Sequence, residues 1–227
     1  MHLIFIPARS NSKGIPEKNV QRVGSFSLIE RALRSVQLSS IDARVVLAVD
    51  EGCCRDHAEQ LLGSNRYPGL EVYDRSADNA RDHSTTESVM AEYLVPRLAG
   101  LRFETISLVQ VTSPFTSPDT IERCVGATRS NGRASLTVAR RHDFRWSADG
   151  APLNYDPAGR PRRQDWPGEL FETGAVYSTT PALYEESGVR LSAPCNLIEV
   201  DDIEALEIDT GTDLAVCRAI AAYEKVQ

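Results

Sequence analysis

The 227-residue sequence has no long apolar run and is short of positive charge. It carries 25 lysine and arginine residues against 32 aspartate and glutamate residues, for a formal net charge of -7. Binding nucleic acid without sequence preference requires excess cations to displace phosphate counterions, so this balance disfavours such binding. No apolar stretch approaches about twenty residues, and no basic region followed by an apolar one opens the chain. We therefore expect a cytoplasmic protein with no membrane span.

The cysteines form no recognisable pattern either. There are five, an odd number, and none is spaced as CxxC, which argues against a zinc site and against a disulfide framework. We expect reduced thiols in the core. The length and the near-average composition fit one globular domain covering residues 1–227, without disorder or repeats.

Short apolar runs rich in β-branched residues alternate with helical patterns along the chain. The runs lie at 3–6, 45–49, 106–111 and 135–139. Helical spacing follows at 27–36, and again in a closing helix that we expect to pack through Leu214, Ala219, Ile220 and Tyr223. This alternation predicts a three-layer α/β/α fold around a mostly parallel sheet, with ligands bound at the carboxyl ends of the strands.

Two helix starts are readable from their first residues. Ser84 with Glu87 three residues later predicts a capping box. Ser117 followed by Pro118 predicts an N-cap and a first helical position.

Between residues 140 and 168 the apolar pattern fails. Gly, Pro, Asp and Arg dominate, and Trp146 and Trp166 lie within a polar run. Apolar periodicity resumes at 170–178, so we interpret 140–168 as an inserted arm and not as a linker between domains.

The scarce cations gather directly after the first predicted strand, in IPARSNSKGIPEKNV at 6–20. Arg9 offers a bidentate fork and Lys13 a point charge for phosphate oxygens, and Gly14 lets the backbone approach them closely. Neither GxxxxGK[ST] nor GxGxxG spacing is present, which disfavours P-loop and dinucleotide-binding proteins. For this loop taken alone, an ordinary solvated turn is an equal alternative.

Five segments, in order, resemble the cytidylyltransferases that activate sialic acids and related nonulosonic acids. The loop IPARSNSKGIPEKN matches that family's IPAR-x-x-SKG-IP-x-KN. The other segments are DRSADNARDHSTT at 74–86, LVQVTSPF at 108–115, ETGAVY at 172–177 and LEIDTGTDL at 206–214. Related enzymes for the eight-carbon sugar acid of lipopolysaccharide have an acidic QGDEP-like stretch where this chain has QVTSP. The resemblance spans nearly the whole chain and implies a nucleotide-diphospho-sugar transferase-like fold.

The resemblance implies transfer of CMP from CTP to the anomeric hydroxyl of a 2-keto sugar acid, with release of pyrophosphate and with Mg²⁺ as cofactor. Such transfer depends on alignment and on neutralising the charge of phosphate oxygens. The implied phosphate clamp, which also carries catalysis, is Arg9, Lys13 and Lys18. Ser12 and Asn19 are further nucleotide contacts.

The same matching places Arg75 and Thr86 near the cytosine, and Gln110 where the base pocket meets the sugar pocket. Each has a plainer alternative. Arg75 would form a surface ion pair with Asp74 or Asp78, Thr86 would be a first-turn helix residue, and Gln110 would cap the next turn.

Asp209 and Glu207 are the implied metal ligands. In a strand, this spacing puts both carboxylates on one face, where they could hold Mg²⁺. The family usually has IDIDT here, so Glu207 replaces an aspartate. A helix N-cap role for Asp209 or Thr212 competes. Asp50 likewise either orients a ligand or caps the helix that follows it.

On the acceptor side, Arg163 matches an arginine of the family's arm and Arg145 lies near a family lysine. Tyr177 is retained, whereas Phe171 stands where the family has a basic residue. Thr173 with Gly174 stands where the family has an Asn-Gly pair. We expect substrate contacts from these positions in a less cationic pocket, for an acceptor other than N-acetylneuraminate. The alternative for both arginines is a solvated loop.

In the family the arm reaches across a homodimer, so Arg145 and Arg163 would serve the partner's active site. Trp146 and Trp166 suit such an interface, or equally core packing. Two other functions remain open. One is a cytidylyltransferase for another acidic acceptor, such as a different ulosonic acid or a phosphonate. The other is a nucleotide-binding homologue without turnover.

Overall fold

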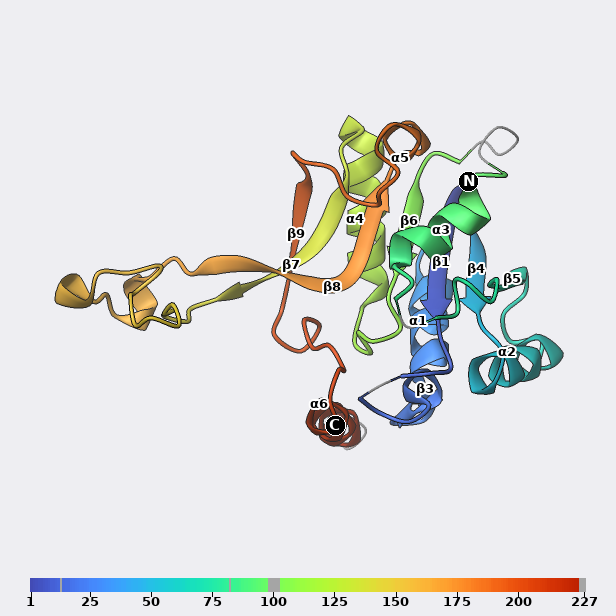
Figure 1. Ribbon diagram of the computed structural model, residues 1–227, viewed down its shortest axis with the longest axis horizontal. Coiled ribbons are helices and arrows are strands. Elements are labelled where there is room, and N and C mark those ends of the chain that lie inside the picture. The colour runs from blue at the N-terminus through green and yellow to red at the C-terminus, as the bar shows by residue number, and fades with distance from the viewer. Residues whose placement is uncertain (13, 82, 98–102, 225–227) are drawn as a thin grey trace.

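The computed structural model describes residues 1–12, 14–81, 83–97 and 103–224, and a seven-stranded sheet forms its centre (Figure 1). The strand order is β5-β4-β1-β6-β8-β7-β9. Strand bounds are β1 His2–Ala8, β4 Ala43–Val49, β5 Leu70–Asp74, β6 Ile106–Val109, β7 Ser135–Arg141, β8 Glu169–Thr179 and β9 Asn196–Val200. Strand β8 runs antiparallel to β6 and β7, and the other pairings of this sheet are parallel.

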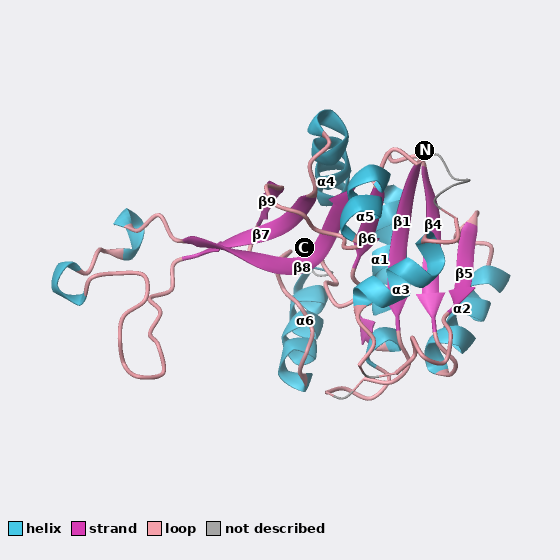
Figure 2. Ribbon diagram, turned by 45° about the horizontal axis from the view of Figure 1, so that its top comes forward, coloured by secondary structure: helices cyan, strands magenta, loops and turns pink. Residues whose placement is uncertain are grey.

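Helices cover both faces of the sheet, which confirms the three-layer prediction. Their bounds are α1 Leu28–Leu38, α2 Cys53–Gly63, α3 Thr86–Leu94, α4 Pro118–Asn131, α5 Pro181–Ser187 and α6 Gly211–Glu224. Successive residues of β1 point to opposite faces: Ile4 and Ile6 pack with α1, α2, α4 and α6, whereas Leu3 and Phe5 pack with α3 and α5. Figure 2 shows α3 and α5 in front of the strands. Among the described residues, no helix combines the length and the apolar character needed to cross a membrane.

The predicted start of α3 is wrong by one residue. Thr85 is the N-cap, and its side chain accepts a hydrogen bond from Ser88 N at 3.0 Å. The Ser84 hydroxyl instead donates to Asp78 O at 2.7 Å, within the preceding turn, so it does not cap the helix. Glu87 therefore has no capping role. At α4 the prediction is confirmed, because Ser117 accepts from Thr120 N and is followed by proline.

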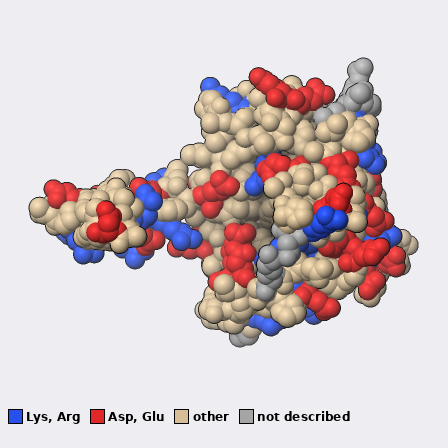
Figure 3. Space-filling view, viewed as in Figure 1, with Lys and Arg blue, Asp and Glu red and all other residues tan. Residues whose placement is uncertain are grey.

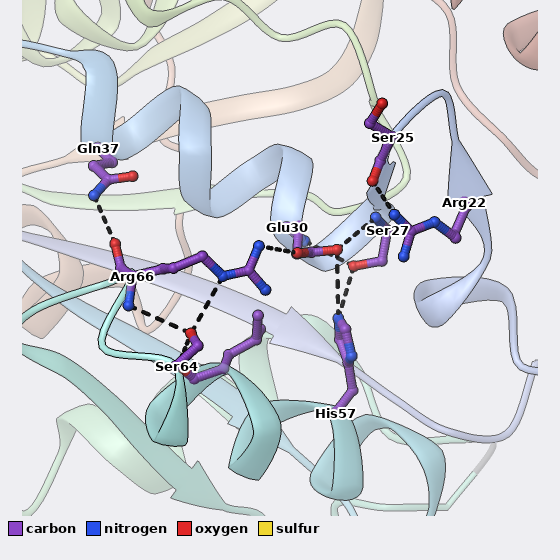
Figure 4. Close-up of polar contacts among 9 residues, drawn as sticks. Arg22, Ser25, Ser27, Glu30, Gln37, His57, Ser64 and Arg66 are labelled. Atoms are coloured by element: carbon purple, nitrogen blue, oxygen red, sulfur yellow. Dashed lines mark hydrogen bonds and ion pairs between the residues drawn. The ribbon is translucent and has the colours of Figure 1, made fainter.

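The start of α1 is held by a buried polar network, drawn in Figure 4. The Ser27 hydroxyl accepts from Glu30 N at 3.0 Å, while the Glu30 carboxylate accepts from Ser27 N at 2.9 Å. His57 of α2 lies 2.8 Å from the same hydroxyl, and Arg66 forms an ion pair with Glu30 at 3.0 Å. Burial opposes ionisation of Glu30, but the Ser27 hydrogen bonds and Arg66 outweigh it and lower the pKa of this carboxyl. The network fixes α1 against α2 directly after the opening loop.

Helix α6 packs through a stripe that includes Leu214, as predicted, but otherwise differs from the predicted one. Leu214, Cys217 and Ala221 are buried, and their spacing places them on one helical face. Ala219 is exposed and Tyr223 is 67% exposed, so the prediction is wrong for these two residues.

The arm projects from the domain where β7 and β8 extend beyond the sheet (Figure 1). Residues 142–168 include two short 3-10 helices, η2 Pro157–Gly159 and η3 Arg163–Asp165. Aromatic side chains pack against one another within the arm. The ring centroid of Phe144 lies 4.4 Å from that of Tyr155 and 6.0 Å from that of Trp166. Trp166 thus packs within the arm, whereas Trp146 is 51% exposed.

Candidate active site

A cavity of about 420 Å³ opens beside the carboxyl ends of β1 and β6. Its walls come from the opening loop, the start of α3, the residues after β6 and the segment before α6. The predicted residues that line it are Arg9, Ser12, Lys18, Asn19, Arg75, Thr86, Gln110, Glu207 and Asp209. Lys13, predicted for the phosphate clamp, lies outside the described residues. Figure 3 shows a hollow on the face that carries α3, with acidic and basic side chains around it.

The opening loop is held from within by Asn19, part of a short 3-10 helix, η1 Lys18–Val20. Its Nδ2 donates to Arg9 O at 2.9 Å. Asn19 is only 4% exposed, and its Oδ1 has no hydrogen-bond partner among the described residues. An unpaired buried acceptor is costly, so this oxygen is suited to accept a hydrogen bond from a bound ligand.

Asp50 holds the opening loop through a hydrogen bond to its backbone. Its Oδ1 accepts from Ser10 N at 2.6 Å, and the Ser10 hydroxyl accepts from Cys54 N at 3.0 Å. Helix α2 starts at Cys53 after Gly52, so the predicted N-cap role of Asp50 is wrong. Ser10 satisfies an amide of the first turn instead, which the sequence did not indicate because the two segments meet only in the fold.

Lys18 joins the opening loop to the segment before α6. Its Nζ donates to Ile208 O at 2.8 Å and lies 3.1 Å from Asp209 Oδ1. The close approach of the two segments also explains why glycine is needed at position 14, because a Cβ there would lie 2.6 Å from Asp209 O. The cationic loop and the carboxylate segment are therefore in direct contact.

Residues 206–209 are irregular and not the predicted strand, yet Glu207 and Asp209 still line the cavity on either side of buried Ile208. Glu207 accepts from Thr112 Oγ1 at 3.1 Å. Burial, and secondarily the charge of Asp209, raise the pKa of Glu207. Gly174 has φ +77°, and a Cβ there would lie 3.2 Å from the Glu207 carboxylate, so glycine leaves room for it.

Neither Asp209 nor Thr212 caps α6. The Asp213 carboxylate accepts from Asp209 N and Thr210 N at 3.1 and 2.7 Å, and Asp213 N donates to Thr210 Oγ1. This is a capping box, and the T-x-x-D spacing was a signal for it in the sequence. Because Thr210 and Asp213 cap the helix, the side chain of Asp209 takes no part in capping and is left to Lys18 and the cavity.

A Mg²⁺ ion fits this donor set. Magnesium prefers oxygen ligands and is usually held by one or two carboxylates together with substrate phosphates and water. Among the described residues no group of three or more His, Cys, Asp or Glu side chains forms a metal site. The pair Glu207 and Asp209 is thus a partial site that phosphate oxygens would complete.

Arg75 is half-buried, and its Nε and Nη2 donate to Ala48 O at 3.2 and 3.1 Å. The surface ion pair proposed as its alternative is wrong, because Asp74 pairs with Arg55 and Asp78 pairs with Arg81.

Thr86 is the first residue of α3 and Gln110 follows β6. Gln110 N donates to Ala175 O at 2.9 Å, while its side-chain amide makes no hydrogen bond to the described part of the chain. The turn that follows is closed by Thr116 and Ser113 and not by Gln110. Its amide therefore faces the cavity with both donor and acceptor unused.

Of the residues predicted to contact the acceptor, Gln110 lines this cavity and the others do not. Phe171 lines a second cavity of about 220 Å³, which shares Glu207 with the first. Tyr177 is 3% exposed in the core between the sheet and α3, where its hydroxyl donates to Glu172. Arg145 is paired with Glu169 at 2.9 Å, at the base of the arm.

Arg163 is exposed in η3, within the arm (Figure 1). Because the arm extends away from its own domain, Arg163 does not line the first cavity of its own chain. Arg145 does not line it either, but its guanidinium carbon lies 5.6 Å from the centroid of the Phe171 ring, which lines the second cavity.

Comparison with known proteins identifies the family of the chain. The sequence profile of a family described as Cytidylyltransferase matches residues 3–209. N-acylneuraminate cytidylyltransferase B of Danio rerio is 32% identical over 93% of this chain and 49% of its own length. CMP-N,N'-diacetyllegionaminic acid synthase of Legionella pneumophila is 26% identical over 94% of this chain and 93% of its own. The chain thus spans about half the length of the fish enzyme and nearly all of the bacterial one.

Among solved structures, CMP:2-keto-3-deoxy-manno-octonic acid synthetase complexed with CTP superposes with a TM-score of 0.69. The superposition covers 99% of this chain and 100% of that one, at 16% identity, so it shows the shared fold alone. The family match covers most of the chain and includes both the opening loop and Asp209. The chain belongs to the cytidylyltransferase family.

Proposed function

We propose that this protein transfers CMP from CTP to the anomeric hydroxyl of a nonulosonic 2-keto sugar acid and releases pyrophosphate. The observation that carries the proposal is one cavity in which a cationic loop faces a pair of carboxylates. Arg9 and Lys18 come from the loop, and Glu207 and Asp209 from the other wall. The names of the similar enzymes from fish and from Legionella support the nonulosonic class of acceptor.

Base recognition is assigned to the neutral polar groups of the same cavity. The Gln110 amide offers a donor and an acceptor, and the buried Asn19 Oδ1 offers an acceptor. Cytosine presents an exocyclic amine and acceptor atoms on its pairing edge, so unpaired groups of this kind can discriminate it. Arg75 and Thr86 complete the wall on this side.

Glu207 and Asp209 would hold Mg²⁺, which supplies neutralisation of charge on the transferring phosphate when it is bound. Arg9 and Lys18 add fixed positive charge from the adjoining wall, and Lys13 belongs to the same loop. The chain's own contribution is alignment: it positions the triphosphate and the carboxylates together without covalent chemistry.

The direct test measures pyrophosphate release for each of the four ribonucleoside triphosphates against a panel of 2-keto sugar acids that includes N-acetylneuraminate and N,N'-diacetyllegionaminate. We expect turnover with CTP and at least one nonulosonic acid, because the base contacts suit cytosine. A preference for ATP or UTP contradicts the base assignment. CTP turnover with no acid of the panel favours another acidic acceptor, and CTP binding without any turnover favours a binding homologue.

The metal assignment predicts that Asp209→Asn lowers kcat by roughly 100-fold or more, because it removes a charged ligand beside the reacting phosphate. Steady-state rates across a Mg²⁺ titration check this, with the exposed Asp202→Asn as the matched control. CTP binding without Mg²⁺, measured by calorimetry, should change little. Wild-type kcat and an unchanged Mg²⁺ requirement in Asp209→Asn would overturn the metal role.

We also propose a homodimer in which the arm reaches the partner's cavity. The arm exposes Trp146 at 51% and Leu153 at 57%, together with Arg163. Exposed apolar groups on a projecting element are typical of an interface. A cytoplasmic location is proposed as well, since all five cysteines are free thiols, as expected in a reducing compartment.

Light scattering after size exclusion tests the dimer. We expect twice the 25.0 kDa mass of one chain, and the mass of one chain after residues 144–166 are replaced by a short Gly-Ser turn, because that segment carries the exposed apolar groups. Substituting Leu197, an exposed leucine outside the arm, by Ser is the control and should leave the dimer intact. A monomeric wild type, or a dimer that survives loss of the arm, contradicts the proposal.

A further inference from the structure

The second cavity, of about 220 Å³, lies between the β7–β8 ribbon and the segment before α6. The ladder pairs Ala139 with Phe171 and Arg141 with Glu169, so Ala139, Phe171 and Arg141 lie on one face of the ribbon. The opposite wall includes Glu207 and Asp213.

This cavity is placed where an acceptor would have to bind. It shares Glu207 with the nucleotide cavity, so a molecule inside it lies beside the carboxylate pair. An attacking hydroxyl must approach the α-phosphate within about 3.5 Å to react. A pocket that adjoins the nucleotide at its metal-binding end satisfies this requirement.

The carboxylates around the cavity already have hydrogen-bond donors. Glu172 accepts from the Tyr177 hydroxyl, and Glu207 accepts from Thr112. Asp213 accepts from the backbone at the start of α6. Each of these carboxylates therefore has at least one hydrogen-bond donor from the protein, and Glu207 is the one that would also bind Mg²⁺.

The cation of the lining is not occupied in this way. Arg141 lies with its guanidinium carbon 5.6 Å from the centroid of the Phe171 ring. Among the described residues no carboxylate forms an ion pair with it. The two neighbouring arginines are both paired with carboxylates. Arg140 makes two hydrogen bonds of 2.9 Å to Glu199, and Arg145, whose guanidinium carbon also lies 5.6 Å from the Phe171 ring centroid, is paired with Glu169.

We propose that Arg141 binds the carboxylate of the acceptor acid in this second cavity, while the Phe171 ring packs against an apolar face of the sugar. A guanidinium matches a carboxylate bidentately, and Arg141 provides one beside the aromatic ring. The inference rests on the proposed function, since it assumes an acidic acceptor. The chain has no basic residue at Phe171, and in this proposal Arg141 on the facing strand supplies the cation.

The test compares Arg141→Ala, Arg141→Lys and the matched control Arg140→Ala, whose side chain bonds to Glu199 outside the cavity. The acceptor is the acid of the panel that the wild type turns over fastest, and its carboxamide is the neutral probe. CTP affinity by calorimetry reports folding and the nucleotide site. We expect Arg141→Ala to raise KM for the acid by roughly 10- to 100-fold at unchanged CTP affinity, as for loss of a hydrogen bond to a charged group.

The carboxamide separates a carboxylate contact from general packing. The wild type should discriminate strongly between acid and carboxamide, and Arg141→Ala should lose most of that discrimination. Arg141→Lys should keep part of it, because the charge is retained without the fork.

If Arg141→Ala matches Arg140→Ala in KM and in discrimination, Arg141 does not bind the carboxylate. If the wild type itself turns over no acid, the proposed function fails and not this assignment alone. The two failures are thus distinguishable.

Discussion

The candidate site depends on contact between segments from opposite ends of the chain. Lys18 donates to Ile208 O and faces Asp209, and Gly14 leaves room for the backbone of the same segment. The Asp209 side chain is 68% exposed, so solvent screens the pair and its contribution to stability is small, about 0–1 kcal/mol. The main effect of this contact is to fix the position of the two segments relative to each other. The cations after β1 and the carboxylates before α6 are held on adjoining walls of one cavity.

Several neighbouring contacts maintain this arrangement without occupying the groups that would meet a ligand. Asp50 and Ser10 hold the loop against α2, and Thr210 with Asp213 caps α6 in place of Asp209. The raised pKa of Glu207 has a related meaning. Loss of hydration around its carboxylate and the charge of Asp209 make ionisation more costly than in water. A bound Mg²⁺ would lower this pKa. At a pH near the pKa of Glu207, metal binding would therefore release a proton from this carboxyl.

Much of the fold was predictable because buried parallel strands are nearly continuous apolar runs. LIFI at 3–6 and VVLAV at 45–49 fall inside β1 and β4 for this reason. The antiparallel direction of β8 was not predictable, because the arm reverses the chain through 27 residues, 142–168, without regular periodicity. At α3, two adjacent hydroxyl residues both suited the N-cap, and only the turn contact of Ser84 with Asp78 decides between them.

The site was partly predictable for a similar reason. The cationic loop and Asp209 are local patterns, whereas the roles of Asp50, Asp213 and Arg141 depend on which segments meet. Arg141 is the clearest case. It sits among other arginines in the sequence, and only the ladder of β7 with β8 places it beside Phe171.

The most direct measurement of the central claim is a crystal structure of the protein with CTP and Mg²⁺. The account predicts the triphosphate between the opening loop and the segment before α6, with Arg9 and Lys18 on its oxygens and the metal on Asp209. A nucleotide bound elsewhere, with Lys18 still joined to Ile208 O and Asp209 and the cavity free of phosphate, would contradict it.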